Sequence, residues 1–165
     1  MQRTSQERKE KLSQRFMETC RQGIILRAGM AHTAYDRQLP STVASNGREK
    51  ICKGQVSSSD IIGLLDTSLS NKGKAGFAFT DKALYCSALE NRDSTFMILY
   101  EDIDFIEYDD SDDDDITIHI YSKYNSRPYQ INHPWFSKKK IMSFLEAAKE
   151  LYEESNEDTL DWDKL

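Results

Sequence analysis

Hydrophobic and polar positions alternate over short segments through the middle of the chain, between about residues 60 and 133. Isoleucine, phenylalanine and tyrosine are frequent in these segments, and such side chains favour the half-buried surface of a pleated sheet. Turn-forming residues interrupt them, for example Thr80-Asp81-Lys82 and Asn91-Arg92-Asp93. The pattern predicts seven strands, at about residues 61–69, 74–81, 83–90, 94–101, 103–109, 115–122 and 127–133.

An amphipathic helix is predicted on each side of these strands. Between about residues 4 and 27 the apolar residues recur every three or four positions, and the helix should end near Gly23 or Gly29. Between about residues 135 and 154 the same spacing returns, and Pro134 stands where a proline fits a helix start. The second apolar stripe consists of Ile141, Phe144, Leu145, Ala148, Leu151 and Tyr152. It should cover the open side of the strand layer.

The remaining segments show no regular period. Residues 31–54 mix Thr, Ser, Asn and Gly, which predicts an irregular connector. Residues after 154 are acidic and sparse in apolar side chains. The sequence therefore predicts a basic N-terminal helix with an irregular connector over residues 1–56, a strand domain over residues 57–154, and an acidic C-terminal tail over residues 155–165.

Seven strands followed by one amphipathic helix are the plan of the pleckstrin-homology superfold. Two short motifs make the similarity more specific: Gly-x-x-x-Thr-Asp-x-x-x-Tyr from Gly76 to Tyr85, after a Lys-Gly-Lys loop, and Tyr-x-Asp-Ile from Tyr100 to Ile103. With these motifs, residues 60–153 resemble the bacterial pleckstrin-homology-like domains. The resemblance implies an α+β fold, in which an antiparallel seven-stranded sheet or partly open barrel is capped by the C-terminal helix. It also implies a non-enzymatic binding module.

Length and composition agree with an ordinary globular chain. The 165 residues suffice for one domain with its own core. No apolar run approaches the ~20 residues that a membrane helix needs, and none resembles the core of a signal peptide. We therefore expect a cytoplasmic protein. The three cysteines are widely separated and form no Cys-x-x-Cys pair, so the sequence predicts neither a disulfide framework nor a zinc site.

The net charge of −6 hides an asymmetry along the chain. Residues 1–53 contain eleven Lys/Arg and five Asp/Glu, whereas residues 54–165 contain eleven Lys/Arg and twenty-three Asp/Glu. An acidic body repels phosphate backbones, which argues against general nucleic-acid binding. Two interpretations of the basic N-terminal segment remain: it contacts an anion, or it lies against the acidic body of the same chain.

Between Glu101 and Asp115, ten of fifteen residues are acidic and none is basic. The run lacks the glycine bend and the terminal glutamate of an EF-hand, so calcium is not indicated. Clustered carboxylates accelerate association with a positive surface, which predicts a docking surface for a basic protein partner. A hydrated connecting loop is the alternative. The candidate partner-binding residues are Glu101, Asp104, Glu107, Asp109, Asp110, Asp112, Asp113, Asp114 and Asp115.

Two groups of lysines are candidates for anion binding. Lys72 and Lys74 lie in the loop that corresponds to the one which lipid-binding relatives of the fold use, although the strand that follows supplies no further Lys or Arg. Lys138, Lys139 and Lys140 occupy the first turn of the closing helix, where the helix dipole disfavours cations. They either neutralise the acidic run or form an anion site with the helix amides.

Catalysis finds no support in the motifs. His32, His119 and His133 have no acid or nucleophile at a known motif spacing, and His119 should lie on the solvent side of its strand. The sequence thus predicts a non-enzymatic, protein-binding module without a cofactor. The alternative is a small acidic inhibitor or immunity protein that blocks a basic toxin or nuclease. Binding of an anionic lipid or phosphate through Lys72 and Lys74 is the third hypothesis.

Overall fold

A computed structural model describes residues 4–87, 95–109 and 116–163, with side chains described as far as residue 154. Three α-helices are present in this part of the chain: α1 (Ser5–Arg21), α2 (Ser41–Asn46) and α3 (Lys138–Asp163). The strands are β1 (Met30–Thr33), β2 (Ile61–Asp66), β3 (Gly76–Thr80), β4 (Ala83–Ser87), β5 (Phe96–Leu99), β6 (Ile103–Tyr108), β7 (Ile118–Ser122) and β8 (Tyr129–Ile131). None of the described helices is both long and apolar enough to cross a membrane.

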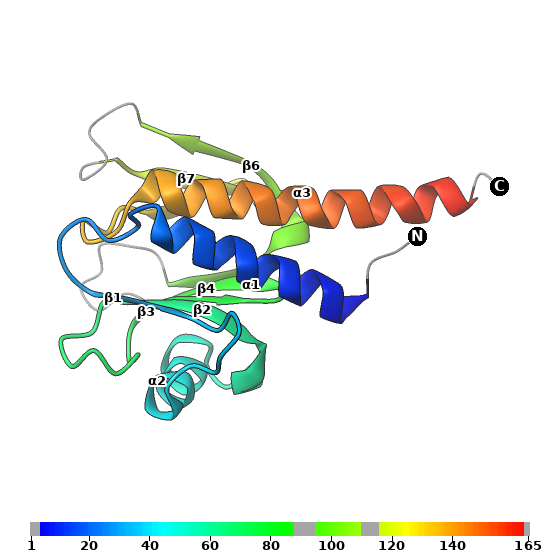
Figure 1. Cartoon of the computed structure of the whole chain (residues 1–165). Helices are drawn as coiled ribbons and strands as arrows, with labels where there is room; N and C mark the ends of the chain where they lie inside the picture. The colour runs from blue at the N-terminus through cyan, green and yellow to red at the C-terminus, as the bar shows by residue number, and fades with distance from the viewer. Residues whose placement is uncertain (1–3, 88–94, 110–115, 164–165) are drawn as a thin grey trace.

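The strands form two antiparallel sheets. β1 to β5 make a five-stranded sheet in chain order, and β6 to β8 make a three-stranded sheet. Helices α1 and α3 run antiparallel to each other over one face of the larger sheet, and α2 lies on its other face (Figure 1). The smaller sheet lies on the far side of α3 (Figure 1). The fold is therefore α+β, with two sheets that do not close into one barrel.

Each of the seven predicted strand segments contains one observed strand, from β2 to β8. A single seven-stranded sheet or partly open barrel is not confirmed, because the strands divide between two sheets and β1 adds an eighth strand to the described structure. The helix predicted to end near residue 154 continues to Asp163, so part of the predicted tail is helical. The N-terminal helix ends at Arg21, followed by Gly23 in a left-handed conformation with φ +97°.

The predicted irregular connector was also wrong in part. Met30–Thr33 forms β1, which pairs with β2 in the register Met30↔Asp66, and Ser41–Asn46 forms α2. A π-helical turn over Gly47–Ile51 follows α2 directly. Helix α2 and the π-helical turn cover a second, smaller core on the face of the sheet opposite α1, whereas Ala31 of β1 packs against the main core. The smaller core includes Val43, Ile51, Cys52, Leu64, Ala78 and Tyr85.

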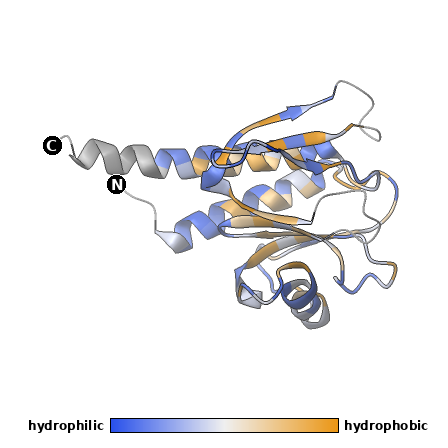
Figure 2. Cartoon of the chain, turned by 180° about the vertical axis from the view of Figure 1, so that it is seen from behind, coloured by the Kyte–Doolittle hydropathy of each residue, from blue (hydrophilic) through white to orange (hydrophobic). Residues whose placement is uncertain are grey.

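The main core lies between the five-stranded sheet, the two long helices and the smaller sheet. Hydrophobic positions concentrate on both sheets and on the inner sides of α1 and α3 (Figure 2). At its centre three rings meet: Phe16 of α1 lies 4.8 Å from Phe79 of β3 and 5.4 Å from Phe144 of α3, and the last two are 5.2 Å apart. The N-terminal helix thus shares its core with residues 57–154, and the predicted boundary at residue 56 does not separate two cores.

Phe16 reaches this position because β2 has no side chain beneath it. A Cβ atom built on Gly63 would overlap the Phe16 ring. The ring itself is fully buried. Helix α1 begins with a capping box, in which the Thr4 hydroxyl accepts from the Glu7 amide and the Glu7 carboxylate accepts from the Thr4 amide. Cap and ring together determine where α1 lies on the sheet.

The turn between β3 and β4 is held from several directions. The Thr80 hydroxyl accepts hydrogen bonds from the amides of Lys82 and Ala83, as the Thr-Asp motif predicts. The Tyr100 hydroxyl donates to the Thr80 carbonyl at 2.8 Å, and the Tyr152 hydroxyl donates to the Asp81 carbonyl at 2.7 Å. Because Tyr100 precedes β6 and Tyr152 belongs to α3, this turn connects both sheets with the closing helix.

Gly63→Ala should destabilise the fold by about 1–3 kcal/mol, because the added methyl group would overlap the Phe16 ring in a filled core. Elsewhere in a strand, replacing glycine by alanine would be neutral or stabilising. The shorter side chain of Phe16→Leu should relieve part of this cost in the double variant. Urea unfolding of the four proteins measures the coupling, and strictly additive losses would contradict the contact.

Tyr100→Phe should lower the free energy of unfolding by about 1 kcal/mol, because the Thr80 carbonyl loses its hydroxyl donor in a buried site. Tyr124→Phe is the matched control, since Tyr124 is 77% exposed. Chemical denaturation of both variants gives the comparison. Equal stability of the two variants would show that the hydroxyl contributes nothing to the turn.

Burial, together with the neighbouring Asp60 carboxylate, raises the pKa of Asp81 above its usual range. The carboxyl group of Asp81 loses its proton at a higher pH in the folded state than in the unfolded state. The folded state therefore becomes less stable relative to the unfolded state as pH rises above 3.8. Asp81→Asn should therefore gain stability relative to the parent between about pH 3.5 and 6. Parallel stability curves for the two proteins over that range would refute this expectation.

Candidate protein-binding face

The outward face of the smaller sheet carries exposed carboxylates and aromatic rings. We call it the acidic–aromatic face, and it comprises Asp104, Phe105, Glu107, Asp109, His119 and Tyr121. Strand β6, which supplies three of these residues, is an edge strand of its sheet (Figure 1). The opposite side of β7, formed by Ile118 and Ile120, is fully buried. The alternation along β7 thus leaves one side of the strand for contacts outside the core.

The register of β6 against β7 brings these residues together. Phe105 pairs with Tyr121, and Glu107 pairs with His119. The register shifts between Ile103 and Phe105, which leaves the intervening Asp104 without a partner in the pairing. Such a bulge turns a strand locally and re-aims its side chains. Asp104 is exposed at this point, beside the aromatic pair.

The aromatic pair is stacked although it lies on the surface. The ring centroids of Phe105 and Tyr121 are 4.4 Å apart and their planes differ by 13°. Phe105 is 44% exposed, and Tyr108 at the end of the same strand is 46% exposed. Cross-strand aromatic pairs stabilise a sheet by up to about 1 kcal/mol, so the stack also keeps the face rigid. It presents a flat apolar platform to solvent.

Acidic groups surround this platform. Residues 101–109 contain five carboxylates and no Lys or Arg. The Asp109 carboxylate lies 3.7 Å from Nε2 of His119, so a protonated His119 would form an ion pair there. A shallow hollow of about 490 Å³ lies between Glu107, Tyr108, Asp109, His119 and Tyr121. The arrangement suits an extended cationic segment, because carboxylates and ring faces both attract cations.

The predicted partner-binding residues divide into two sets. Glu101, Asp104, Glu107 and Asp109 are all exposed, with Glu101 in the 3₁₀ turn that precedes β6. Asp110, Asp112, Asp113, Asp114 and Asp115 lie outside the described residues. The sequence reasoning missed Phe105 and Tyr121 as partners of the carboxylates. Their alternation with buried isoleucines was visible, but the register that pairs them was not.

Lys72 and Lys74 are exposed in the loop between β2 and β3. This loop is organised by the buried Asp66 carboxylate, which accepts hydrogen bonds from the amides of Ser68 and Gly73, both at 2.8 Å. The Lys72 carbonyl accepts from the Asn46 side chain of the α2 region at 2.8 Å. The loop is therefore held through its backbone, and the side chains of Lys72 and Lys74 are exposed on it.

The three lysines at the start of α3 do not form one surface cluster. Lys138 is fully buried, and its Nζ donates to the His133 carbonyl at 3.0 Å. Lys140 is partly buried, with its Nζ 3.5 Å from Oε1 of Gln22. Lys139 is exposed. Burial of Lys138 reduces the predicted anion site to Lys139 and Lys140, and the part of the acidic run that they were expected to neutralise lies outside the described residues.

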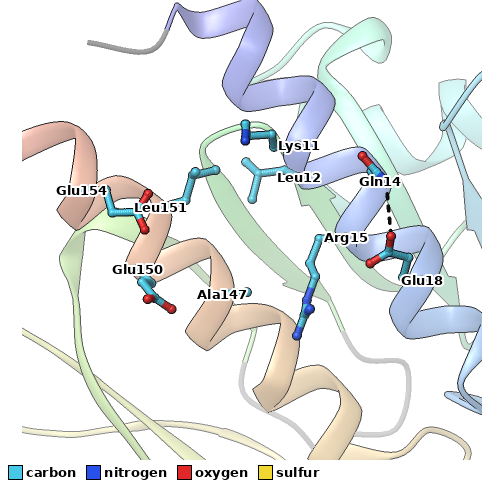
Figure 3. Close-up of a pocket in the computed structure, with 9 residues that line it drawn as sticks. All are labelled: Lys11, Leu12, Gln14, Arg15, Glu18, Ala147, Glu150, Leu151 and Glu154. Atoms are coloured by element: carbon cyan, nitrogen blue, oxygen red, sulfur yellow. Dashed lines mark hydrogen bonds between the residues drawn. The ribbon is translucent and has the colours of Figure 1, made fainter. Parts of the chain in front are cut away.

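A second surface hollow lies along the seam between α1 and α3 and measures about 420 Å³ (Figure 3). Its walls carry both signs of charge, with Lys11 and Arg15 on α1 opposite Glu150 and Glu154 on α3. Arg15 already reaches across the seam, donating to the Ser143 hydroxyl at 3.3 Å. These contacts join the two helices, so the hollow belongs to their packing.

Burial shifts the titratable side chains of Cys20, Cys52, Tyr152 and His32 toward their neutral forms. Burial raises the pKa of Cys20 and of Cys52 to about 12, which keeps both thiols protonated and poorly nucleophilic at neutral pH. Burial likewise raises the pKa of Tyr152 to about 12, and lowers that of His32. Among the described residues, no group of three His, Cys, Asp or Glu side chains is placed to hold a metal ion.

Comparison of the chain with models of protein families, with characterised proteins and with solved structures finds no match in any of the three.

Proposed function

We propose that this chain is a non-enzymatic protein-binding module that recognises an extended, Lys- or Arg-rich segment of a partner through the acidic–aromatic face. The observation that carries the proposal is the partly exposed Phe105–Tyr121 stack, with Glu107 on the same face and the exposed Asp104 next to Phe105 in β6. Exposed aromatic rings beside carboxylates offer a cation two kinds of attraction at one place.

Charge complementarity supports a basic partner. An Arg or Lys side chain over the Phe105 or Tyr121 ring would gain about 0.5–1 kcal/mol at an exposed site. The adjoining carboxylates would accept charge-assisted hydrogen bonds from the same cation, which are stronger than neutral ones. Because the acidic stretch 101–109 contains no basic residue, its field should also speed encounter with a positive surface.

The position of the face at an edge strand supports an extended segment rather than a helix. The outer side of β6 pairs with no other described strand, so its free backbone groups are open to an added strand. Main-chain pairing would then supply affinity and the carboxylates would select basic side chains.

The element order supports a pleckstrin-homology-like fold for residues 60–153, which we keep as part of the proposal. Four antiparallel strands, β2 to β5, are followed by three more, β6 to β8, and then by the long helix α3. Relative to that plan, β1, α1 and α2 are additions on the N-terminal side. An acidic inhibitor would use the same face, and it would differ by abolishing the activity of the basic partner that it binds.

The proposal is tested with a fluorescent octa-arginine peptide as the probe, titrated with the protein at two salt concentrations. The triple variant Asp104→Asn, Glu107→Gln, Asp109→Asn should weaken binding about tenfold or more and flatten its salt dependence, because three of the contacting charges are removed. Phe105→Ser should weaken binding about threefold with the salt dependence kept, because the loss is one ring contact.

Two controls distinguish binding at this face from an effect of net charge and from nonspecific hydrophobic binding. Glu146→Gln with Glu150→Gln and Glu153→Gln removes the same number of carboxylates from exposed positions of α3. Leu69→Ser removes an apolar side chain that is 89% exposed on another loop. Both control proteins should bind the peptide as the parent does. If the α3 variant loses as much affinity as the β6 variant, the peptide is responding to net charge and the proposed face is wrong.

A further inference from the structure

A cavity of about 460 Å³ lies on the opposite side of the molecule from the acidic–aromatic face, between α1, α2 and the start of β2. We infer that it is a binding site for a small amphipathic anion, in which a carboxylate or phosphate head contacts Lys9, Arg37 and serine hydroxyls while an aliphatic portion lies on Leu39 and Ile61. This site is independent of the proposed protein-binding function and uses none of its residues.

The cavity is walled by four separate segments. Lys9 and Ser13, four residues apart, project from one side of α1. The segment after β1 supplies Ala34, Arg37, Gln38 and Leu39, and α2 supplies Ser41 and Ala44. Ser58 and Ser59 come from the 3₁₀ turn that leads into β2, and Ile61 is the first residue of β2. Its volume falls in the range of about 300–1,000 Å³ that small-molecule sites occupy.

Among the described residues, two cations and no carboxylate line the cavity. The Lys9 ammonium is positioned by a 2.5 Å hydrogen bond to the Ser59 carbonyl. An ammonium has three donors, so two remain for a ligand. Arg37 is exposed at the rim and carries a planar fork of donors that matches a carboxylate or a phosphate. Together they make the cavity positive in a protein whose net charge is −6.

Ser13 adds a hydroxyl to the polar part of the lining. Its side chain is only 8% exposed and lies at the cavity wall, where the hydroxyl can bind water or a ligand. Three further serines, Ser41, Ser58 and Ser59, line the same space. A head group with several acceptor oxygens would use these donors.

The apolar floor of the cavity indicates that the ligand has an apolar portion in addition to its anionic head. Leu39 and Ile61 are nearly fully buried and belong to the smaller core, while Ala34 and Ala44 pack beside them. An inorganic anion would leave this apolar surface in contact with water, whereas an aliphatic chain of a few carbons would cover it. The combination of cationic rim and apolar floor therefore selects an amphipathic anion over a bare one.

The acidic groups near the cavity determine which of its two cations is the better one to substitute. The Lys9 ammonium also interacts electrostatically with the Asp81 carboxyl, so part of the positive charge of Lys9 is compensated within the fold. An adjoining hollow on the other side of Lys9 is lined by Glu7, Glu10 and Asp36 and should repel anions. Arg37 is consequently the cation whose removal reports most directly on a ligand, and its exposure makes the substitution tolerable for the fold.

The experiment is an NMR titration of the full, isotope-labelled chain with hexanoate, hexyl phosphate, inorganic phosphate and hexanol. The first two should shift amide signals of residues 34–44 and 58–61, and at least one of them should bind about tenfold more tightly than hexanol or inorganic phosphate. A preference for hexanoate would identify a carboxylate head, and a preference for hexyl phosphate a phosphate head. Equal binding of hexanol, or shifts confined to other segments, would overturn the inference.

Variants locate the recognition within the cavity. Arg37→Gln should weaken hexanoate or hexyl phosphate binding about tenfold, as loss of one charged hydrogen-bond donor predicts. Ser13→Ala should weaken it by a smaller factor and leave the melting temperature nearly unchanged, because it removes one small hydroxyl from the cavity wall. Lys11→Gln is the control, since it removes an equal charge from α1 outside the cavity. If Lys11→Gln weakens binding as much as Arg37→Gln, only net charge is being measured and the site is refuted.

Discussion

The contact of Phe16 with the bare backbone of Gly63 is the constraint on which the arrangement of this molecule depends. A helix can approach a sheet this closely only where a strand lacks a side chain, and β2 has a glycine at that position. The ring then reaches Phe79 of the sheet and Phe144 of α3 at once. Since α3 in turn covers the smaller sheet, one side chain of α1 connects all the layers of the main core.

The position of α1 also builds a surface. Ser13 precedes Phe16 by three residues, about one helical turn, and Lys9 precedes it by seven residues, about two turns. The depth to which Phe16 enters the core therefore decides how far Lys9 and Ser13 stand from α2 and from the 3₁₀ turn. A change at Gly63 should therefore also change the shape of the cavity, through the position of α1.

Much of the fold was visible in the sequence because its signals are local. Strands β2 to β4 are short, mostly buried runs bounded by turn residues, and β7 alternates between buried and partly exposed positions. The Thr80 hydroxyl makes the turn that the Thr-Asp motif predicts. Strand β1 was missed because Met30–Thr33 is short and is partnered through its backbone by a strand over thirty residues away. The division into two sheets was missed for a similar reason, since alternation identifies a strand and not its neighbours.

The two surfaces differ in how far a sequence could reveal them. The acidic stretch 101–109 is contiguous, so its charge was apparent, whereas the Phe105–Tyr121 stack depends on a register that is shifted by the bulge at Asp104. The cavity combines side chains from segments up to fifty residues apart, such as Lys9 and Ser59, and no linear motif records it. Lys138 shows that a local signal can also mislead. A lysine in a basic run is expected to be exposed, whereas Lys138 is buried and donates a hydrogen bond to the His133 carbonyl.

The charge asymmetry of the chain becomes a spatial separation in the fold. The acidic–aromatic face lies beyond α3, and the cationic cavity lies between α1 and α2 near the larger sheet (Figure 1). Helices and a five-stranded sheet stand between them, and salt screens charges in water within about 8 Å under physiological conditions. Direct electrostatic coupling between the two surfaces is therefore weak. Any coupling between the two surfaces must therefore be transmitted by packed side chains. Helix α1 is the element in a position to do so, because it lines the cavity and its Phe16 packs against Phe144 of α3, the helix beside the smaller sheet.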